Sequence, residues 1–249
     1  MPRPVALLTG AGRSNSIAHA IALALADDGW DVAFTTWTAY EGRVPLQADP
    51  AVGARELEDA LVSRGARALR IEADFADALT PDRVMADAAT LGPVSALVLS
   101  HSEGVDSSIL DTTLDSFDRH FAVNVRAAWL LIRAFALQVP EEGGRIVALT
   151  SDHVAHNLPY GASKGALDRI VHAAARELGH LGITANLVNP GPIDTGWMDA
   201  ETRAALEERQ PTGRLGTPAD TAELVRFLVS SSSAWVTGQL IHSDGGFSS

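Results

Sequence analysis

Residues 5–18 read VALLTGAGRSNSIA, and this stretch decides the fold that the sequence predicts. Four apolar residues of strand length end in Thr9-Gly10, a turn with a second glycine follows, and a helical pattern begins at Ile17. Such a turn lets backbone amides and a helix N-terminus face a pyrophosphate, and the first such turn is where dinucleotide-binding folds hold their ligand. A purely structural turn with two glycines has the same pattern. The helix cap is expected at Ser14, Asn15 or Ser16.

Outward from this unit, short apolar runs alternate with helical patterns along the whole chain. The strand-length runs are 5–8, 31–34, 68–72, 96–99, 145–149, 184–188 and 239–242. The helical patterns are 17–27, 51–63, 81–89, 116–138, 160–178 and 218–228. Short runs buried on both faces, alternating with helices, predict a parallel sheet covered on both sides. We therefore expect an α/β, Rossmann-type, doubly wound parallel sheet, and a single domain over residues 1–249.

The composition narrows the class of protein. The chain has 249 residues, 46% of them apolar, and a net charge of -12. This charge argues against nucleic acid and anionic membranes as partners, and no apolar run reaches the roughly 18 residues of a membrane span. There is no cysteine, so disulfide and thiol chemistry are excluded. We expect a cytoplasmic protein without a metal site.

Tyr160 and Lys164 form the candidate reactive pair. Lys164 is the only lysine among 19 basic residues, and Tyr160 is one of two tyrosines. A spacing of four places phenol and ammonium on one helix face. The cation is expected to lower the pKa of the phenol, which would make Tyr160 a proton donor or acceptor near neutral pH. An exposed lysine beside a half-buried tyrosine gives the same short pattern.

Taken together, several motifs resemble the short-chain dehydrogenase/reductase family over nearly the whole chain. They are the Thr9-Gly10 turn, Asp74, Asn124 within FAVNV, Ser151, Tyr160-x-x-x-Lys164, the PGPIDT stretch at 190–195, TGQ at 237–239 and DGG at 244–246. The resemblance implies a Rossmann-type sheet, a nicotinamide cofactor, a small-molecule carbonyl or alcohol substrate and a homotetramer.

The resemblance also implies catalytic roles for four residues. Tyr160 would give a proton to the carbonyl oxygen, and Ser151 would hydrogen-bond the same oxygen. Lys164 would hold the nicotinamide ribose and lower the pKa of Tyr160. Asn124 would lie in a helix and hold a water that links Lys164 to solvent.

The same resemblance gives a set of cofactor contacts. They are Gly10, Gly12, Arg13, Ser14, Ser16, Ile17, Thr38, Asp74, Phe75, Ser100, His101, Tyr160, Lys164, Pro190, Gly191, Ile193 and Thr195. NADP(H) is the preferred cofactor and NAD(H) a possible one, because residues 34–38 lack the carboxylate that binds a ribose 2′-hydroxyl and Arg13 lies in the phosphate turn. Arg43 is a further candidate for the phosphate. Asp74 would bond the adenine amino group, unless it only caps the turn before Phe75.

Three departures from the family pattern matter. The glycine turn, with Ser16-Ile17-Ala18, is similar to that of enoyl reductases, but the Tyr160–Lys164 spacing is that of carbonyl reductases. Asn157 stands where the more widely spaced tyrosine would fall, so C=O reduction is favoured over C=C reduction. Residues 99–102 read LSHS instead of the usual NNAG, and His101 is either a ligand-facing or a packed side chain. Ser151 precedes Tyr160 by only nine residues, which predicts an altered, more open substrate pocket.

The resulting hypothesis is an NADP(H)-dependent oxidoreductase that reduces a ketone or 3-oxoacyl carbonyl, or oxidises the alcohol, by hydride transfer with Tyr160 as proton donor or acceptor. The alternatives are a cofactor-free lyase similar to halohydrin dehalogenases, an enoyl reductase, and a dinucleotide-binding regulator without catalysis. Residues 196–213, with Trp197 and Met198, are expected to form the substrate lid. In the loop before Tyr160, His153, His156 and Asn157 either shape specificity or are solvated.

Overall fold

The computed structural model describes residues 3–41, 50–196 and 198–249. Its centre is a seven-stranded parallel sheet of order β3-β2-β1-β4-β5-β6-β7. The strands are β1 Val5–Leu8, β2 Asp31–Thr36, β3 Ala68–Glu72, β4 Val94–Leu99, β5 Gly144–Leu149, β6 Ile183–Asn189 and β7 Leu240–His242. The doubly wound parallel sheet predicted from the sequence is thus confirmed, with strand bounds that differ by at most two residues.

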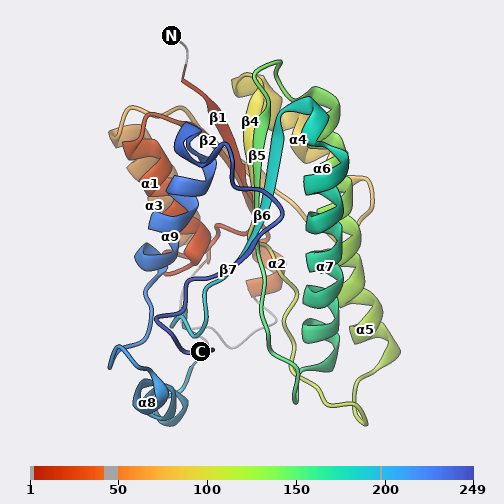
Figure 1. The fold of residues 1–249 in the computed structure, drawn as a ribbon, viewed down its shortest axis with the longest axis vertical. Helices are drawn as coiled ribbons and strands as arrows, with labels where there is room; N and C mark the ends of the chain where they lie inside the picture. The colour runs from red at the N-terminus through yellow and green to blue at the C-terminus, as the bar shows by residue number, and fades with distance from the viewer. Residues whose placement is uncertain (1–2, 42–49, 197) are drawn as a thin grey trace.

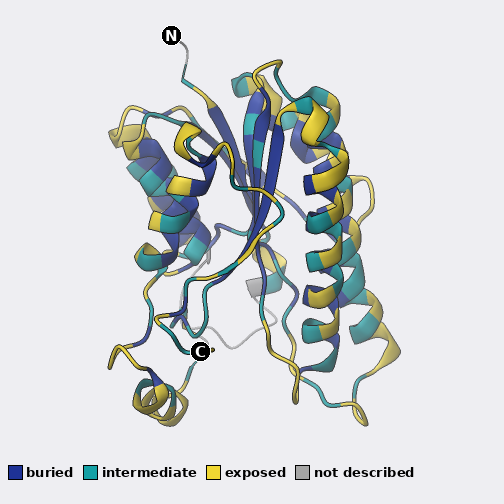
Figure 2. Ribbon diagram, viewed as in Figure 1, coloured by how far each residue is buried: buried dark blue, intermediate teal, exposed yellow. Residues whose placement is uncertain are grey.

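Helices cover both faces of the sheet (Figure 1). On one face lie α1 Ile17–Asp27, α3 Pro50–Ser63 and α9 Pro218–Val229. On the other lie α4 Thr80–Ala88, α5 Leu114–His120, α6 Ala127–Gln138 and α7 Leu158–Glu177. Short 3₁₀ turns occupy Ala89–Leu91, Gly179–Leu181 and Ser231–Ser233. The sheet residues are almost all buried (Figure 2), because a parallel sheet has a helix layer against each face.

One long helix carries a local change in winding. Between α5 and α6 the chain forms a π-helix over Phe121–Arg126, which includes Asn124. Segments of π-helix are rare in proteins, and those that occur are often found at functional sites. Among the described residues, Leu114–Gln138 is long and apolar enough to cross a membrane, but half of it is buried inside the protein. It is therefore accounted for as a core helix of this fold.

The strand order reverses between β1 and β4, which is where open α/β sheets bind their ligands. The two strand ends are joined at this point by one hydroxyl. Thr9 Oγ1 accepts hydrogen bonds from the backbone N–H of Ser100, at 3.0 Å, and of His101, at 3.2 Å. The crevice beyond these strand ends is the place to look for a site.

Candidate functional site

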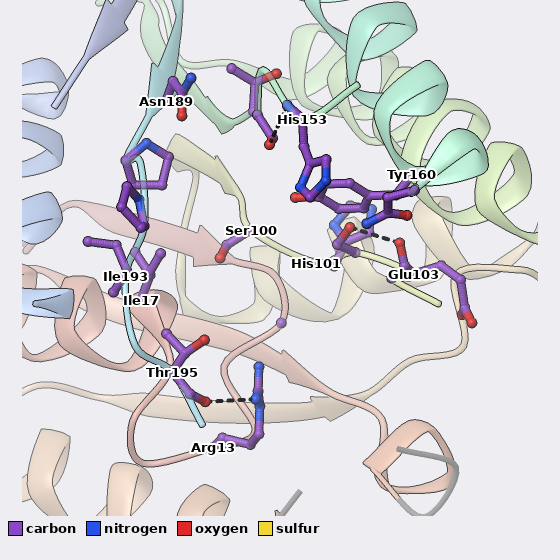
Figure 3. A pocket seen from close by; sticks show the side chains of 18 of the residues that line it. Arg13, Ile17, Ser100, His101, Glu103, His153, Tyr160, Asn189, Ile193 and Thr195 are labelled. Atoms are coloured by element: carbon purple, nitrogen blue, oxygen red, sulfur yellow. Dashed lines mark hydrogen bonds between the residues drawn. The ribbon is translucent and has the colours of Figure 1, made fainter. Parts of the chain in front are cut away.

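A cavity of about 780 Å³ opens at the carboxyl ends of the strands. Figure 3 shows it with Arg13 and Thr195 at one end and Tyr160, His101 and Glu103 at the other. Most predicted site residues line it: Gly10, Gly12, Arg13, Ile17, Asp74, Phe75, Ser100, His101, Ser151, Tyr160, Pro190, Gly191, Ile193 and Thr195. Asn124, Lys164, Ser14, Ser16 and Thr38 do not line it.

The glycine turn has a clear structural reason. Gly10 has φ +77°, and a Cβ there would lie 2.8 Å from His101 Cα. Its N–H donates to Thr35 Oγ1 at 3.1 Å. Ser16 caps α1, because its Oγ accepts from His19 N at 3.1 Å. The turn and the capped helix N-terminus lie along the cavity, where a pyrophosphate fits.

Arg13 connects the phosphate turn to the opposite wall of the cavity. Its Nη1 donates to the backbone carbonyl of Thr195 at 3.1 Å (Figure 3). The guanidinium therefore stands beside the phosphate turn and at the base of the segment predicted to be the lid. A guanidinium can bind phosphate in a bidentate way, so its position fits a dinucleotide phosphate.

Tyr160 lies near the start of α7, and its phenol is hydrogen-bonded with Ser151. The expected lowering of the Tyr160 pKa is wrong for this structure. Desolvation in the cavity raises the pKa of the phenol above its usual value of 10.0, the hydrogen bond with Ser151 lowers it, and the negative charge of Asp106 raises it. The phenol therefore stays protonated at neutral pH.

Lys164 is buried, with 3% of its surface exposed. Its Nζ lies 5.5 Å from the centre of the Tyr160 ring and donates to the Leu149 carbonyl at 2.9 Å. The ammonium thus lies beside the ring and bonds to the backbone. Burial lowers the pKa of Lys164 to about 8, while the carboxylate of Asp168 acts in the opposite direction.

Asn124 is held on all sides by protein atoms. Its Oδ1 accepts from Glu103 N at 2.7 Å and from Ser102 Oγ at 3.3 Å. Its Nδ2 donates to Glu103 O at 3.0 Å and to Ser163 Oγ at 2.8 Å. Ser163 Oγ in turn donates to Tyr160 O at 2.7 Å. The Asn124 side chain thus holds the start of α7 through Ser163. The water relay to Lys164 stays a prediction.

His101 is a packed side chain that also lines the cavity. Its Nε2 lies 3.0 Å from Val123 O and its Nδ1 lies 2.7 Å from Thr9 Oγ1. A carbonyl can only accept, so Nε2 carries the proton and Thr9 donates to Nδ1. Burial, followed by the charge of Lys164, lowers the pKa of His101 to about 3. The neutral ring holds the end of β1 against the π-helix.

An ion cluster beside the cavity escaped the sequence analysis. Glu103, 2% exposed, accepts from Arg119 Nε at 3.0 Å, and Arg119 Nη2 lies 3.3 Å from Asp74 Oδ1. The Arg119 guanidinium also lies 4.6 Å from the centre of the Trp37 ring. Because the backbone of Glu103 holds Asn124, and Asn124 bonds to Ser163, this cluster links Asp74 to α7. Glu103 adjoins the altered LSHS segment, but no local signal marks Arg119.

The end of β2 differs from the sequence prediction. Thr38 is exposed at the start of a short helix, α2 Thr38–Glu41, and its N–H donates to Glu72 Oε1 at 2.7 Å. Thr36 and Trp37 line the cavity in its place. Thr36 Oγ1 also donates to Glu72 Oε2 at 2.9 Å. A carboxylate absent from β2 is thus supplied by the neighbouring strand β3, which the sequence did not reveal.

The expected lid holds α8 Ala200–Arg209, a helix without a buried residue. Asp199 caps it by accepting from Thr202 N at 2.8 Å, and Arg203 pairs with Asp194. Met198, Thr202, Leu206 and Arg209 line the cavity. Two residues considered from the sequence, Arg43 and Trp197, lie outside the described residues.

Comparisons with known proteins agree with this geometry. A family profile described as enoyl-(acyl carrier protein) reductase matches residues 10–248. The uncharacterized oxidoreductase YjdA of Bacillus subtilis is 35% identical, over 98% of this chain and 96% of its own. An NADPH-dependent aldehyde reductase-like chloroplastic protein of Arabidopsis thaliana is 34% identical, over 98% and 93%.

Solved structures are similar over their whole length. A blue fluorescent protein from a metagenomic library, in complex with NADPH, has a TM-score of 0.87 and 35% identity, with 99% of this chain and 98% of that one covered. A short-chain dehydrogenase from Burkholderia cenocepacia, in complex with NADP, has a TM-score of 0.87 and 33% identity, with the same coverage. The sheet order, the cavity and these likenesses establish that the chain belongs to the short-chain dehydrogenase/reductase family of oxidoreductases.

Proposed function

We propose that the protein reduces a ketone or 3-oxoacyl carbonyl with NADPH, or oxidises the corresponding alcohol, with Tyr160 as the proton donor or acceptor. The observation that carries the proposal is the Tyr160 phenol. It lines the cavity, bonds with Ser151, and has the buried ammonium of Lys164 beside its ring. A proton donor, a hydroxyl and a cation at one point suit the charge that develops on a carbonyl oxygen during reduction.

Each residue has a distinct task in this proposal. A nicotinamide cofactor, when bound, supplies the hydride. Ser151 orients the substrate oxygen, and Tyr160 donates its proton to that oxygen. Lys164 stabilises the resulting phenolate through its positive charge, and two of its three N–H groups remain for other acceptors after the bond to Leu149 O. Asn124 and Ser163 keep the start of α7 in place.

The cofactor preference rests on the phosphate turn and the relatives. The guanidinium of Arg13 is placed to meet a phosphate, and two similar structures are complexes with NADPH or NADP. Against this, Glu72 brings a carboxylate to the end of β2, and a carboxylate there suits a ribose 2′-hydroxyl. We propose NADP(H) as the preferred cofactor and NAD(H) as a weaker substitute.

Enoyl reduction is the second candidate, favoured by the description of the matching profile and by the glycine turn. The spacing of Tyr160 and Lys164 argues for carbonyl chemistry, because Asn157 cannot serve as the acid at the alternative position. A halohydrin-dehalogenase-like lyase would have no use for a dinucleotide site, and a regulator would have no use for the Tyr160–Lys164 pair.

The deciding experiment is a panel of ketones, 3-oxoacyl thioesters and enoyl thioesters, followed by the oxidation of NADPH and of NADH. We expect NADPH oxidation with members of the first two groups and none with the third. Turnover of enoyl thioesters alone would establish the second candidate. Dehalogenation of a halohydrin without cofactor would establish the halohydrin-dehalogenase-like lyase. Tight NADPH binding without turnover of any compound would establish the dinucleotide-binding regulator.

A cytoplasmic homotetramer remains our prediction for location and assembly. The large apolar side chains of Trp129 and Leu137 on α6, and of Trp235 before β7, are exposed in the single chain, Trp235 to 98%. Pairing of helices across a two-fold axis would cover such side chains. Light scattering at micromolar concentration should give the mass of four chains; a single-chain mass would contradict this.

A further inference from the structure

Asn157 carries a polar atom that has no hydrogen-bond partner among the residues that the structure describes. The residue lines the cavity and is 8% exposed. Its Oδ1 is buried and accepts no hydrogen bond. A buried acceptor without a donor costs free energy, so native structures rarely keep one without a reason.

Asn157 does not use this oxygen to cap α7, although it stands at the N-cap position. Asn157 is the N-cap residue of α7, a position that favours asparagine. A side chain there would accept from the second or third helical residue. The second is Pro159, which has no N–H, and Asn157 makes no side-chain cap bond. The backbone of the first turn is held by other bonds: Leu158 N donates to Ser107 O at 2.9 Å and Gly161 N to Asn157 O at 3.0 Å.

Asn157 and Tyr160, three residues apart at the start of α7, both line the cavity. The groups around them are mainly acceptors. Asp106 and Asp152 line the same cavity, and the charge of Asp106 is close enough to Tyr160 to raise the pKa of its phenol. Two guanidinium groups that line the cavity contact other groups: Arg13 bonds to Thr195 O, and Arg209 lies over the Phe247 ring. None of the donors among the described residues, the Ser151 hydroxyl and the Tyr160 phenol included, bonds to the Asn157 oxygen.

We propose that Asn157 is a specificity-determining residue whose Oδ1 accepts a hydrogen bond from a hydroxyl or amino group beside the reacting carbonyl. The substrate class is therefore hydroxyketones or aminoketones rather than simple ketones. This rests on the proposed function: Tyr160 gives its proton to the carbonyl oxygen, hydride adds to the carbonyl carbon, and the neighbouring hydroxyl takes no part in bond making. Its role is to supply the donor that the Asn157 oxygen lacks.

The test compares hydroxyacetone with butanone, which has a methyl in place of the hydroxyl, in the parent and in Asn157→Leu. Leucine keeps the shape of the side chain and removes the acceptor. The ratio of kcat/KM for the two ketones should fall roughly ten- to hundredfold in Asn157→Leu, as expected for a lost partner of a buried polar group. Comparing ratios cancels the intrinsic reactivity of the two ketones. His156→Ala, an exposed change in the same loop, should leave the ratio unchanged.

Asn157→Asp retains a side-chain acceptor and should keep the preference for hydroxyacetone, which a merely structural role would not predict. Asn157→Ala replaces the leucine variant if that protein does not fold. An unchanged ratio in the folded variant overturns the inference but leaves the proposed function intact. It is also overturned if the parent reduces other carbonyls but neither of these two. Failure of the parent to oxidise NADPH with any carbonyl rejects the proposed function as well.

Discussion

The two ends of the cavity are built in different ways. At the end with Tyr160, the side chains of Lys164, Asn124 and His101 are buried and bonded to backbone atoms of β5, of the loop after β4 and of the π-helix. At the end with Trp37, the cavity wall is backed by Thr38 and Glu72, which are exposed and bond to each other beyond the carboxyl ends of β2 and β3. In the proposed function, the first end is preorganised for chemistry, whereas the second selects the cofactor. Substitutions at the first end should therefore lower kcat, and substitutions at the second should weaken the binding of the cofactor.

The largest effect is expected for Tyr160→Phe. The change removes the proton donor and keeps the ring beside Lys164, so kcat should fall by about a thousandfold or more, within the range of general acid catalysis. Fluorescence titration should show nearly unchanged NADPH binding. A kcat within about tenfold of the parent would show that another group supplies the proton.

Lys164→Arg should be the next most damaging change. The ammonium of Lys164 is buried beside the Tyr160 ring and bonds to Leu149 O. A planar guanidinium is larger than an ammonium, and its pKa cannot be tuned in the same way. We expect a loss of roughly a hundredfold in kcat/KM. Arg176→Lys, on the exposed face of the same helix, is the matched control and should be silent. Near-parental turnover of Lys164→Arg would mean that charge alone suffices.

Arg13→Ala tests the end of the cavity that is proposed to select the cofactor. Loss of one guanidinium–phosphate contact should weaken NADPH binding roughly ten- to hundredfold and leave NADH binding almost unchanged. Binding of both cofactors is measured by titration. Equal losses for the two would mean that Arg13 acts only through its bond to Thr195.

Arg119→Gln tests the connection between the two ends. Without the guanidinium, Glu103 is a buried carboxylate that has lost an ion-pair partner, and Asp74 is no longer linked to the catalytic helix. We expect about a tenfold loss spread over kcat and the KM for NADPH, with partial recovery in Arg119→Lys. Arg83→Gln breaks an exposed pair with Asp87 and should change neither constant, because such pairs contribute little. A pure stability loss with parental kinetics would contradict the link.

The smallest effect is a pH dependence. The pKa of Lys164 is lowered to about 8 by burial, so the ammonium is charged below that pH and neutral above it. The pKa of Tyr160 is raised, so the phenol stays protonated throughout. The kcat/KM of the free enzyme for carbonyl reduction should be constant well below pH ~8, fall to half its maximum near pH ~8 and continue to fall above it. A profile that stays flat well above this pH would show that the Lys164 charge is not needed.

The same contrast explains what the sequence could predict. The strands and the covering helices follow from periodicity, which acts locally. The meeting of Ser151 and Tyr160 was expected only from the resemblance to the family. Long-range geometry decided the rest: the direction of the Tyr160 pKa depends on burial, and the carboxylate of Glu72 reaches Thr38 from a neighbouring strand. Arg119, on α5, contacts Glu103 and Asp74, which lie in two loops far from it in the sequence. No sequence pattern predicts this contact.

The claim that chemistry and cofactor selection belong to different ends is tested most directly by saturation kinetics of the unaltered protein with NADPH and NADH on one ketone. The structure predicts kcat values within about threefold for the two cofactors, because both would place the same nicotinamide beside Tyr160. It predicts a kcat/KM about tenfold or more higher with NADPH, because Arg13 distinguishes the phosphate. A large difference in kcat itself, or a preference for NADH, would contradict this division of the cavity.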